Sequence, residues 1–287
     1  MTQARTVPVP GSFDPAAVPV RPAATVMLIR DRADGAGSEV FLLRRTLGAA
    51  FGGGFYVFPG GRLDEADATD EVAAICDGLD DTAASALLGL AHGGLSYWIA
   101  AIRECFEEAG VLLAVRADGA PLHFDDGSVD RFAGARHRLH DGTLGLVEFC
   151  TAENVRLATG SIRYLSHWIT PFGEARRFDT RILLARAPQG QEPLHDDGET
   201  IDSLWMSPAD ALAKVEAGEF MMMPPTIASL RFVAGHPDAD AALAAAAAIE
   251  RPTAIEPKLV VAPDGRVTDI LLPGDDGYDA ADRIVYV

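Results

Sequence analysis

Three glutamates recur at helical spacing within the run RECFEEAGV (103–111). On a helical wheel, Glu104, Glu107 and Glu108 fall in one sector about 100° wide, and the apolar residues of the segment fall on the opposite face. Neighbouring carboxylates repel one another by roughly 1–4 kcal/mol per pair near a surface, and no lysine is interspersed among these three. Such a cluster suits Mg²⁺ or Mn²⁺, which prefer oxygen ligands. For an isolated ExxEE pattern, a solvated acidic helix is the competing interpretation.

A single helix must present these glutamates. Ser96 is a suitable N-cap and Gly110 a suitable stop, so the sequence predicts a helix over 96–109. Arg103 lies four residues before Glu107 and can pair with it, which would fix the rotamer of the glutamate. The cluster is therefore expected on a short, well-delimited helix.

The remaining elements alternate between strands and helices. Two β-branched apolar runs, at 23–30 and 39–45, predict a hairpin, and a short aromatic strand follows at 55–58. Later runs predict strands at 164–171, 176–188 and 199–208, helices at 208–218, 224–235 and 238–250, and a hairpin at 258–273. Strands, then an inserted helix, then further strands and helices indicate a mixed α/β or α+β domain.

Charge limits the classes of partner. The chain has 287 residues, with Lys+Arg 24 against Asp+Glu 42 and a formal net charge of −18. So acidic a surface repels polyanions, which argues against nucleic acid and against an anionic bilayer as partners. An anionic small substrate must instead meet a local group of arginines or bound cations.

Cysteine usage and the N-terminal sequence bear on the compartment. The three cysteines, Cys76, Cys105 and Cys150, show no CxxC spacing, which argues against a disulfide scaffold and a zinc site and fits a reducing cytoplasm. The N-terminal sequence lacks the apolar core of a signal peptide, and no apolar run approaches the length of a membrane span. We expect a cytoplasmic protein.

The glutamate run matches a known motif. RECFEEAGV fits REUxEExGU, the more specific half of the Nudix box, and FPGGRLDEAD (58–67) supplies the glycine of the other half, Gx5E, as Gly61. There are two departures from the box. Asp67 stands where the box has Glu, and the spacer from Ala68 to Ile102 is about 28 residues longer than usual. The chain thus resembles the Nudix superfamily with an interrupted box.

Further runs are similar to one branch of that superfamily, the peroxisomal coenzyme A diphosphatases of animals, which carry an insertion at this place. These runs are WITP (168–171), RRFDTRILLA (176–185), DDGETIDSLWMSP (196–208) and MMPPT (222–226). The resemblance implies a Nudix-type α/β/α sandwich with a mixed sheet, a helical insertion within the box, and a C-terminal extension of helices plus a hairpin. The corresponding boundaries are a flexible arm at 1–21, a Nudix domain at 22–235 with the insertion at about 68–95, and an extension at 236–287 packed on the same domain.

The resemblance also implies roles for individual residues. Glu104, Glu107 and Glu108 would bind Mg²⁺ or Mn²⁺, and the main-chain carbonyl of Gly60 or Gly61 would add a ligand. Arg103 would orient the glutamates. Glu104 is the first choice as general base, and Glu199 in DDGETID is the alternative.

Arginines elsewhere are the expected contacts to an anionic substrate. Arg44 and Arg45 precede the PGG turn and would meet a phosphate or diphosphate, and Arg177 and Arg181 are further candidates. Some coenzyme A-cleaving relatives carry a second arginine after the first strand pair, and this chain lacks it.

Several functions follow from the resemblance. The leading one is a metal-dependent hydrolase that cleaves the diphosphate linkage of coenzyme A, acyl-coenzyme A or a related nucleoside diphosphate derivative. The alternatives are an ADP-ribose or dinucleotide pyrophosphatase, and a catalytically silent nucleotide-binding sensor. The segments 238–250 and 258–273 are candidate surfaces for a homodimer.

Overall fold

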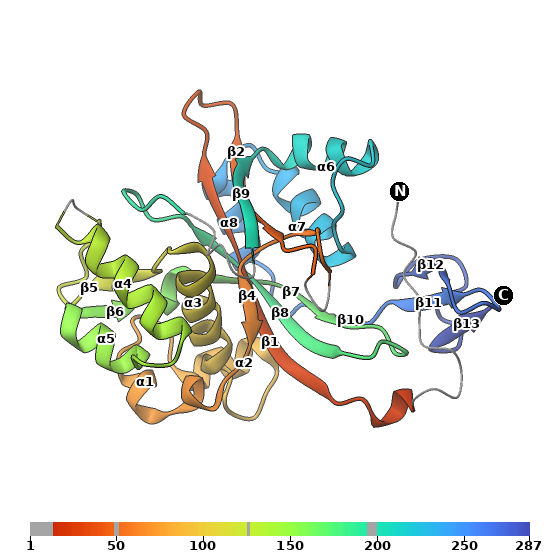
Figure 1. Ribbon diagram of the computed structural model, residues 1–287, viewed down its shortest axis with the longest axis horizontal. Coiled ribbons are helices and arrows are strands. Elements are labelled where there is room, and N and C mark those ends of the chain that lie inside the picture. Colours follow the sequence, from red (N-terminus) through yellow and green to blue (C-terminus); the bar gives the residue numbers. More distant parts are fainter. Residues whose placement is uncertain (1–13, 49–51, 125–126, 194–199) are drawn as a thin grey trace. The chain divides into compact units, whose positions relative to one another are not determined.

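The computed structural model describes residues 14–48, 52–124, 127–193 and 200–287 (Figure 1). The chain divides into two compact units. The larger unit comprises 24–165 and 182–251, and the smaller unit comprises the residues up to 23 together with 166–181 and 252–287. Most of the expected N-terminal arm, residues 1–13, lies outside the described residues.

A mixed sheet forms the centre of the larger unit. Its strands are β1 (Val20–Asp31), β2 (Ser38–Arg45), β3 (Tyr56–Val57), β4 (Gly60–Arg62), β7 (Arg163–Ile169), β8 (Arg177–Arg186) and β9 (Thr200–Met206). Residues 166–169 of β7 and 177–181 of β8 belong to the smaller unit. The strand order is β7-β8-β1-β2-β3, while β4 also pairs with β1 and β9 pairs with β2. The predicted hairpin is confirmed, because β1 and β2 are antiparallel with Ile29 opposite Val40. β9 is antiparallel to β2, with Phe41 opposite Trp205.

Helices cover this sheet on both sides. They are α1 (Asp70–Ala74), α2 (Asp81–Leu88), α3 (Leu95–Ala109), α4 (Val129–His140), α5 (Leu146–Glu153), α6 (Pro208–Glu216), α7 (Pro224–Ala234) and α8 (Ala239–Ala247). Figure 1 shows α1 to α5 gathered on one side of the β1–β2–β9 sheet, with α6 and α7 on the other. β1 is almost continuously buried from Ala23 to Ile29, as expected for a strand covered on both faces. The predicted α/β/α fold class is confirmed.

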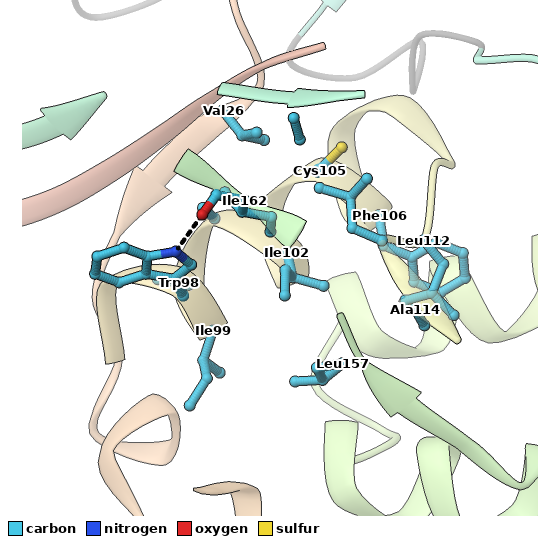
Figure 2. Close-up of a cluster of buried hydrophobic side chains, with 14 of the residues drawn as sticks. Val26, Trp98, Ile99, Ile102, Cys105, Phe106, Leu112, Ala114, Leu157 and Ile162 are labelled. Carbon is cyan, nitrogen blue, oxygen red and sulfur yellow. Dashed lines mark hydrogen bonds between the residues drawn. The ribbon is translucent and has the colours of Figure 1, made fainter. Parts of the chain in front are cut away.

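Helix α3 contributes the centre of the hydrophobic core. Trp98, Ile99 and Ile102 are almost completely buried, and they pack with residues of β1 and of the short β5–β6 pair (Ala114–Arg116 and Val155–Leu157). Figure 2 shows these side chains facing one another, with the Trp98 indole donating a hydrogen bond of 3.3 Å to the Ile162 carbonyl. This burial fixes the apolar face of the helix, so its opposite face is fixed as well.

The smaller unit contains a second sheet. The predicted hairpin at 258–273 is confirmed as β11 (Lys258–Val261) and β12 (Val267–Leu271), and β13 (Ile284–Tyr286) adds to β11 in parallel. The two-residue strand β10 (Ala254–Ile255) pairs in parallel with β7 at His167 and Trp168. No helix within the described residues is long and apolar enough to cross a membrane.

Candidate active site

Helix α3 is capped from outside its own sequence. The predicted end at Gly110 is confirmed, since this residue adopts the left-handed conformation with φ 70° that glycine accepts readily. The predicted N-cap at Ser96 is wrong, because the helix begins at Leu95. Asp81 of α2 instead accepts hydrogen bonds from the main-chain N–H groups of Gly93 (2.9 Å) and Leu95 (3.0 Å). The insertion within the box therefore supplies the cap of the helix that follows it.

Arg103 links the two halves of the interrupted motif. Its guanidinium donates two hydrogen bonds of 2.9 Å to the carboxylate of Asp67 and a third, of 3.0 Å, to the carbonyl of Arg62. Asp67 is 2% exposed and also accepts from the main-chain N–H of Asp64. The 3₁₀ turn Glu65–Ala68 presents Asp67 to the helix, so the shorter side chain still reaches Arg103.

The same guanidinium also contacts two of the three glutamates. Its Nη1 lies 2.9 Å from Glu104 Oε1 and 3.5 Å from Glu107 Oε2. The side chains of Glu104 and Glu107 are only 16% and 11% exposed. Arg103 is therefore in a position to orient both carboxylates while its other edge is held by Asp67.

The PGG turn packs directly against the carboxylates. The main-chain N–H of Gly60 donates a hydrogen bond of 2.9 Å to Glu108 Oε2, and Glu108 is 6% exposed. At Gly61, an added Cβ would collide with the carboxylate of Glu104. A side chain at position 61 is thus excluded, because the main chain and the carboxylate share this space.

The site holds more negative than positive charge. Within 4.0 Å of the Arg103 guanidinium lie four carboxylates, those of Asp64, Asp67, Glu104 and Glu107. Burial raises the pKa of Glu104 to about 7, although Arg103 acts in the opposite direction. Burial likewise raises the pKa of Glu107. A second cation at this face would stabilise the ionised carboxylates that burial disfavours.

The donors at this face suit a hard divalent cation. They are carboxylate oxygens and the main chain of a glycine turn, which are the ligand types that Mg²⁺ and Mn²⁺ prefer. In the part of the chain that the structure describes, no three acidic, His or Cys side chains converge into a finished ligand shell. The Arg103 guanidinium contacts oxygens of Glu104 and Glu107 that a bound cation would also use.

The four candidate arginines lie in different surroundings. Arg44 and Arg45 end β2, and the Arg44 guanidinium lies 5.7 Å from the ring centroid of Tyr56. Among the described residues, Arg44 Nε is buried without a hydrogen-bond partner. Arg177 and Arg181, on β8, are 5% and 4% exposed. Glu199, the alternative base, lies outside the described residues.

Arg177 and Arg181 form hydrogen bonds and ion pairs with other groups of the smaller unit. Arg177 donates to the Thr170 carbonyl (3.0 Å) and to Glu256 (2.7 Å), and Arg181 pairs with Asp179. To bind an anionic substrate, either guanidinium would have to exchange these contacts.

One arginine that contacts the end of α3 was not predicted from the sequence. Arg136 of α4 donates hydrogen bonds of 2.8 Å from Nε to the carbonyl of Glu107 and of 2.8 Å from Nη2 to that of Glu108. Arg136 lies 29 positions after Glu107 and 28 after Glu108, so no local spacing in the sequence predicts the contact.

Comparison with known proteins identifies the family. The model of the NUDT19 Nudix domain matches residues 84–233. The acyl-coenzyme A diphosphatase NUDT19 of Xenopus laevis is 24% identical over 218 residues, and that of Homo sapiens is 26% identical over 278. The matches cover 65% and 84% of this chain, and 57% and 72% of the two relatives.

A solved structure agrees with this assignment. The crystal structure of a NUDIX hydrolase from Alicyclobacillus acidocaldarius is 28% identical with a TM-score of 0.66, and the match covers 79% of this chain and 97% of that one. The family model spans more than half of the chain, and the helix and the PGG turn place both halves of the interrupted motif side by side. The chain therefore belongs to the Nudix family, as a protein with the NUDT19 Nudix domain.

Proposed function

We propose that this chain is a metal-dependent hydrolase that cleaves the diphosphate linkage of coenzyme A, acyl-coenzyme A or a related nucleoside diphosphate derivative. The observation that carries the proposal is the carboxylate excess around Arg103, on the helix that bears the family motif. The names of the two curated relatives support the coenzyme A class of substrate.

The residues of the motif would have two roles, metal binding and proton transfer. Glu104, Glu107, Glu108 and the main-chain carbonyl of Gly60 or Gly61 would hold Mg²⁺ or Mn²⁺. When bound, such an ion neutralises diphosphate charge, polarises the phosphorus and makes a water more acidic. Glu104 would accept the proton of the attacking water.

The supporting residues act on these groups rather than on the substrate. Arg103 holds Glu104 and Glu107, while Asp67 and the Arg62 carbonyl hold Arg103. Burial of this chain of contacts restricts the range of positions that the carboxylates can take. Such preorganisation is what a reaction at a charged phosphorus requires.

Arginines on β2 would receive the anionic parts of the substrate. We assign this role first to Arg44, because its Nε is buried without a hydrogen-bond partner in the described residues. Arg45, the next residue on β2, is the second candidate. Arg177 and Arg181 rank lower, because Glu256 and Asp179 already engage them.

The test is a substrate panel. The purified chain is incubated with Mg²⁺ or Mn²⁺ and coenzyme A, an acyl-coenzyme A, ADP-ribose, NADH or a dinucleoside tetraphosphate, and the products are identified by mass spectrometry. We expect 3′,5′-ADP together with 4′-phosphopantetheine or its acylated form. Cleavage of ADP-ribose or a dinucleotide alone would overturn the substrate class. Saturable binding without cleavage of any member would indicate a sensor and overturn the activity.

A further inference from the structure

The last turn of helix α3 receives two hydrogen bonds from one side chain. Carbonyl groups in the final turn of an α-helix lack partners within the helix. In α3, the carbonyls of Glu107 and Glu108 accept from Nε and Nη2 of Arg136, each at 2.8 Å. The planar guanidinium presents its donors in a rigid fork, so it fixes two neighbouring peptides relative to one another.

The helix that carries Arg136 is itself anchored to α3. One turn before Arg136, Phe132 is 3% exposed, and its ring lies edge-on to Phe106 of α3, with the centroids 6.3 Å apart. Phe132 also packs edge-on against Phe149 of α5, at 5.4 Å. These aromatic contacts hold α4 beside α3, so the position of the Arg136 guanidinium is fixed by the packing of its helix.

The two peptides held in this way belong to two of the proposed metal ligands. The carboxylate of Glu107 extends toward Arg103, and that of Glu108 accepts from the Gly60 N–H. The direction of a side chain in a helix follows from the backbone dihedrals at its Cα. The last turn is also where helices fray. A restraint on these two peptides therefore restrains where both carboxylates can lie.

We propose that Arg136 is a positioning residue, which holds the main chain of Glu107 and Glu108 so that their carboxylates are preorganised for a divalent cation. This inference rests on the proposed function, because it assumes that these carboxylates bind the ion. Partners that orient metal ligands in other proteins typically change metal affinity by about 10–100-fold when they are removed. A residue that merely capped the helix would change the stability of the fold and leave metal affinity alone.

The test compares Mn²⁺ binding in matched variants of the full chain, measured by the electron paramagnetic resonance signal of free Mn²⁺. Arg136→Gln removes the fork, and Arg136→Lys keeps the positive charge with a single donor group. The control is Arg131→Gln on the same helix, where the guanidinium pairs with Glu153 of α5 (2.8 Å). Circular dichroism at the assay temperature establishes that each variant is folded.

We expect Arg136→Gln to weaken Mn²⁺ binding by about tenfold or more, Arg136→Lys to weaken it at least threefold, and Arg131→Gln to leave it unchanged. A lower unfolding temperature for Arg136→Gln with wild-type Mn²⁺ affinity would overturn the positioning role alone. If Arg136→Gln does not fold, Arg136→Lys decides, and unchanged affinity in that variant overturns the inference. Absence of Mn²⁺ binding by the wild-type chain would overturn the proposed metal site and this inference together.

Discussion

Two groups of arginines and carboxylates, one in each unit, differ in how their charges are balanced. In the larger unit, one guanidinium forms ion pairs with several carboxylates. Those within 4.0 Å of Arg103 are Asp64, Asp67, Glu104 and Glu107. In the smaller unit, one carboxylate serves two guanidinium groups, since Glu256 lies 2.7 Å from Arg177 and 2.6 Å from Arg283. The first group has an excess of negative charge, and the second does not.

A second carboxylate of the smaller unit, that of Asp179, also contacts two basic side chains. Asp179 lies 2.6 Å from His167 Nε2 and also pairs with Arg181. Burial would raise the pKa of Asp179, but its hydrogen bond with His167 and the charge of Arg181 outweigh burial and hold the pKa below the usual range. Buried charges are normally paired within the protein or coordinated to a metal. The comparison indicates that the smaller unit's carboxylates are structural, and it supports the proposal that those of α3 bind an ion.

The largest expected effect is a loss of activity when the carboxylates of α3 are replaced. Glu107→Gln and Glu108→Gln should each lower the diphosphatase rate constant by about 10²-fold or more, because a charged ligand is lost where the charge of the substrate must be neutralised. The urea midpoint should not fall for Glu107→Gln, because removing one of several like charges relieves repulsion. Glu148→Gln, at an exposed site on α5, is the control for both measurements. A loss of fold that accompanies the loss of rate would make these carboxylates structural.

The converse substitution in the smaller unit should act on stability. In Glu256→Gln, the guanidinium groups of Arg177 and Arg283 lose a charged acceptor, and Arg177 is only 5% exposed. We expect the free energy of unfolding to fall by about 1–3 kcal/mol, with the rate constant unchanged. Urea denaturation followed by tryptophan fluorescence measures the first, and the substrate assay the second. A lower rate constant with unchanged stability would indicate that Glu256 and its arginines, and not the α3 carboxylates, form the active site.

A smaller effect is expected at the N-terminal end of α3. Asp81→Ala removes the acceptor for the main-chain N–H groups of Gly93 and Leu95, and loss of such a cap typically costs about 1 kcal/mol. Leu95 precedes Glu104 by nine residues, or roughly 14 Å of helix, so Mn²⁺ affinity should stay at the wild-type value. Asp80→Ala, which removes only the exposed N-cap of α2, is the matched control. Weaker metal binding in Asp81→Ala would show that the whole helix shifts.

The smallest effect is a dependence on pH. Because the folded-state pKa of Asp179 is lowered, its ionised form stabilises the fold above the ordinary aspartate pKa, and this contribution is lost as pH falls through the folded-state pKa. The difference in unfolding free energy between wild type and Asp179→Asn should therefore be largest near neutral pH and shrink on acidification below about pH 4. Urea midpoints of both proteins across this range measure it. A difference independent of pH would mean that packing, not charge, is lost.

The central helix and its acidic face could be predicted from the sequence because both are local. Apolar periodicity and Gly110 determine where α3 lies and ends, and the motif pairs Arg103 with Glu107 within one turn. The caps could not be predicted, because Asp81 and Arg136 reach α3 from other segments of the chain. Nothing in their spacing marks them.

The same reasoning applies to the rest of the fold. The hairpin of β11 and β12 has a sequence signal in its Asp264-Gly265 turn, whereas β13 is three residues long and joins β11 only through tertiary pairing. Asp67 illustrates a limit of motif matching. The shorter side chain departs from the family pattern, yet the turn at 65–68 brings it within 2.9 Å of Arg103.

The most direct test of the carboxylate imbalance is anomalous diffraction from a crystal soaked in Mn²⁺. The account predicts a manganese peak bounded by Glu104, Glu107, Glu108 and the main chain of Gly60–Gly61, with the two carboxylates that contact Arg103 turned at least partly toward the ion. It also predicts no peak at Glu256 or Asp179. An open, soaked site without manganese at α3, with Glu104 and Glu107 still on Arg103, would contradict it.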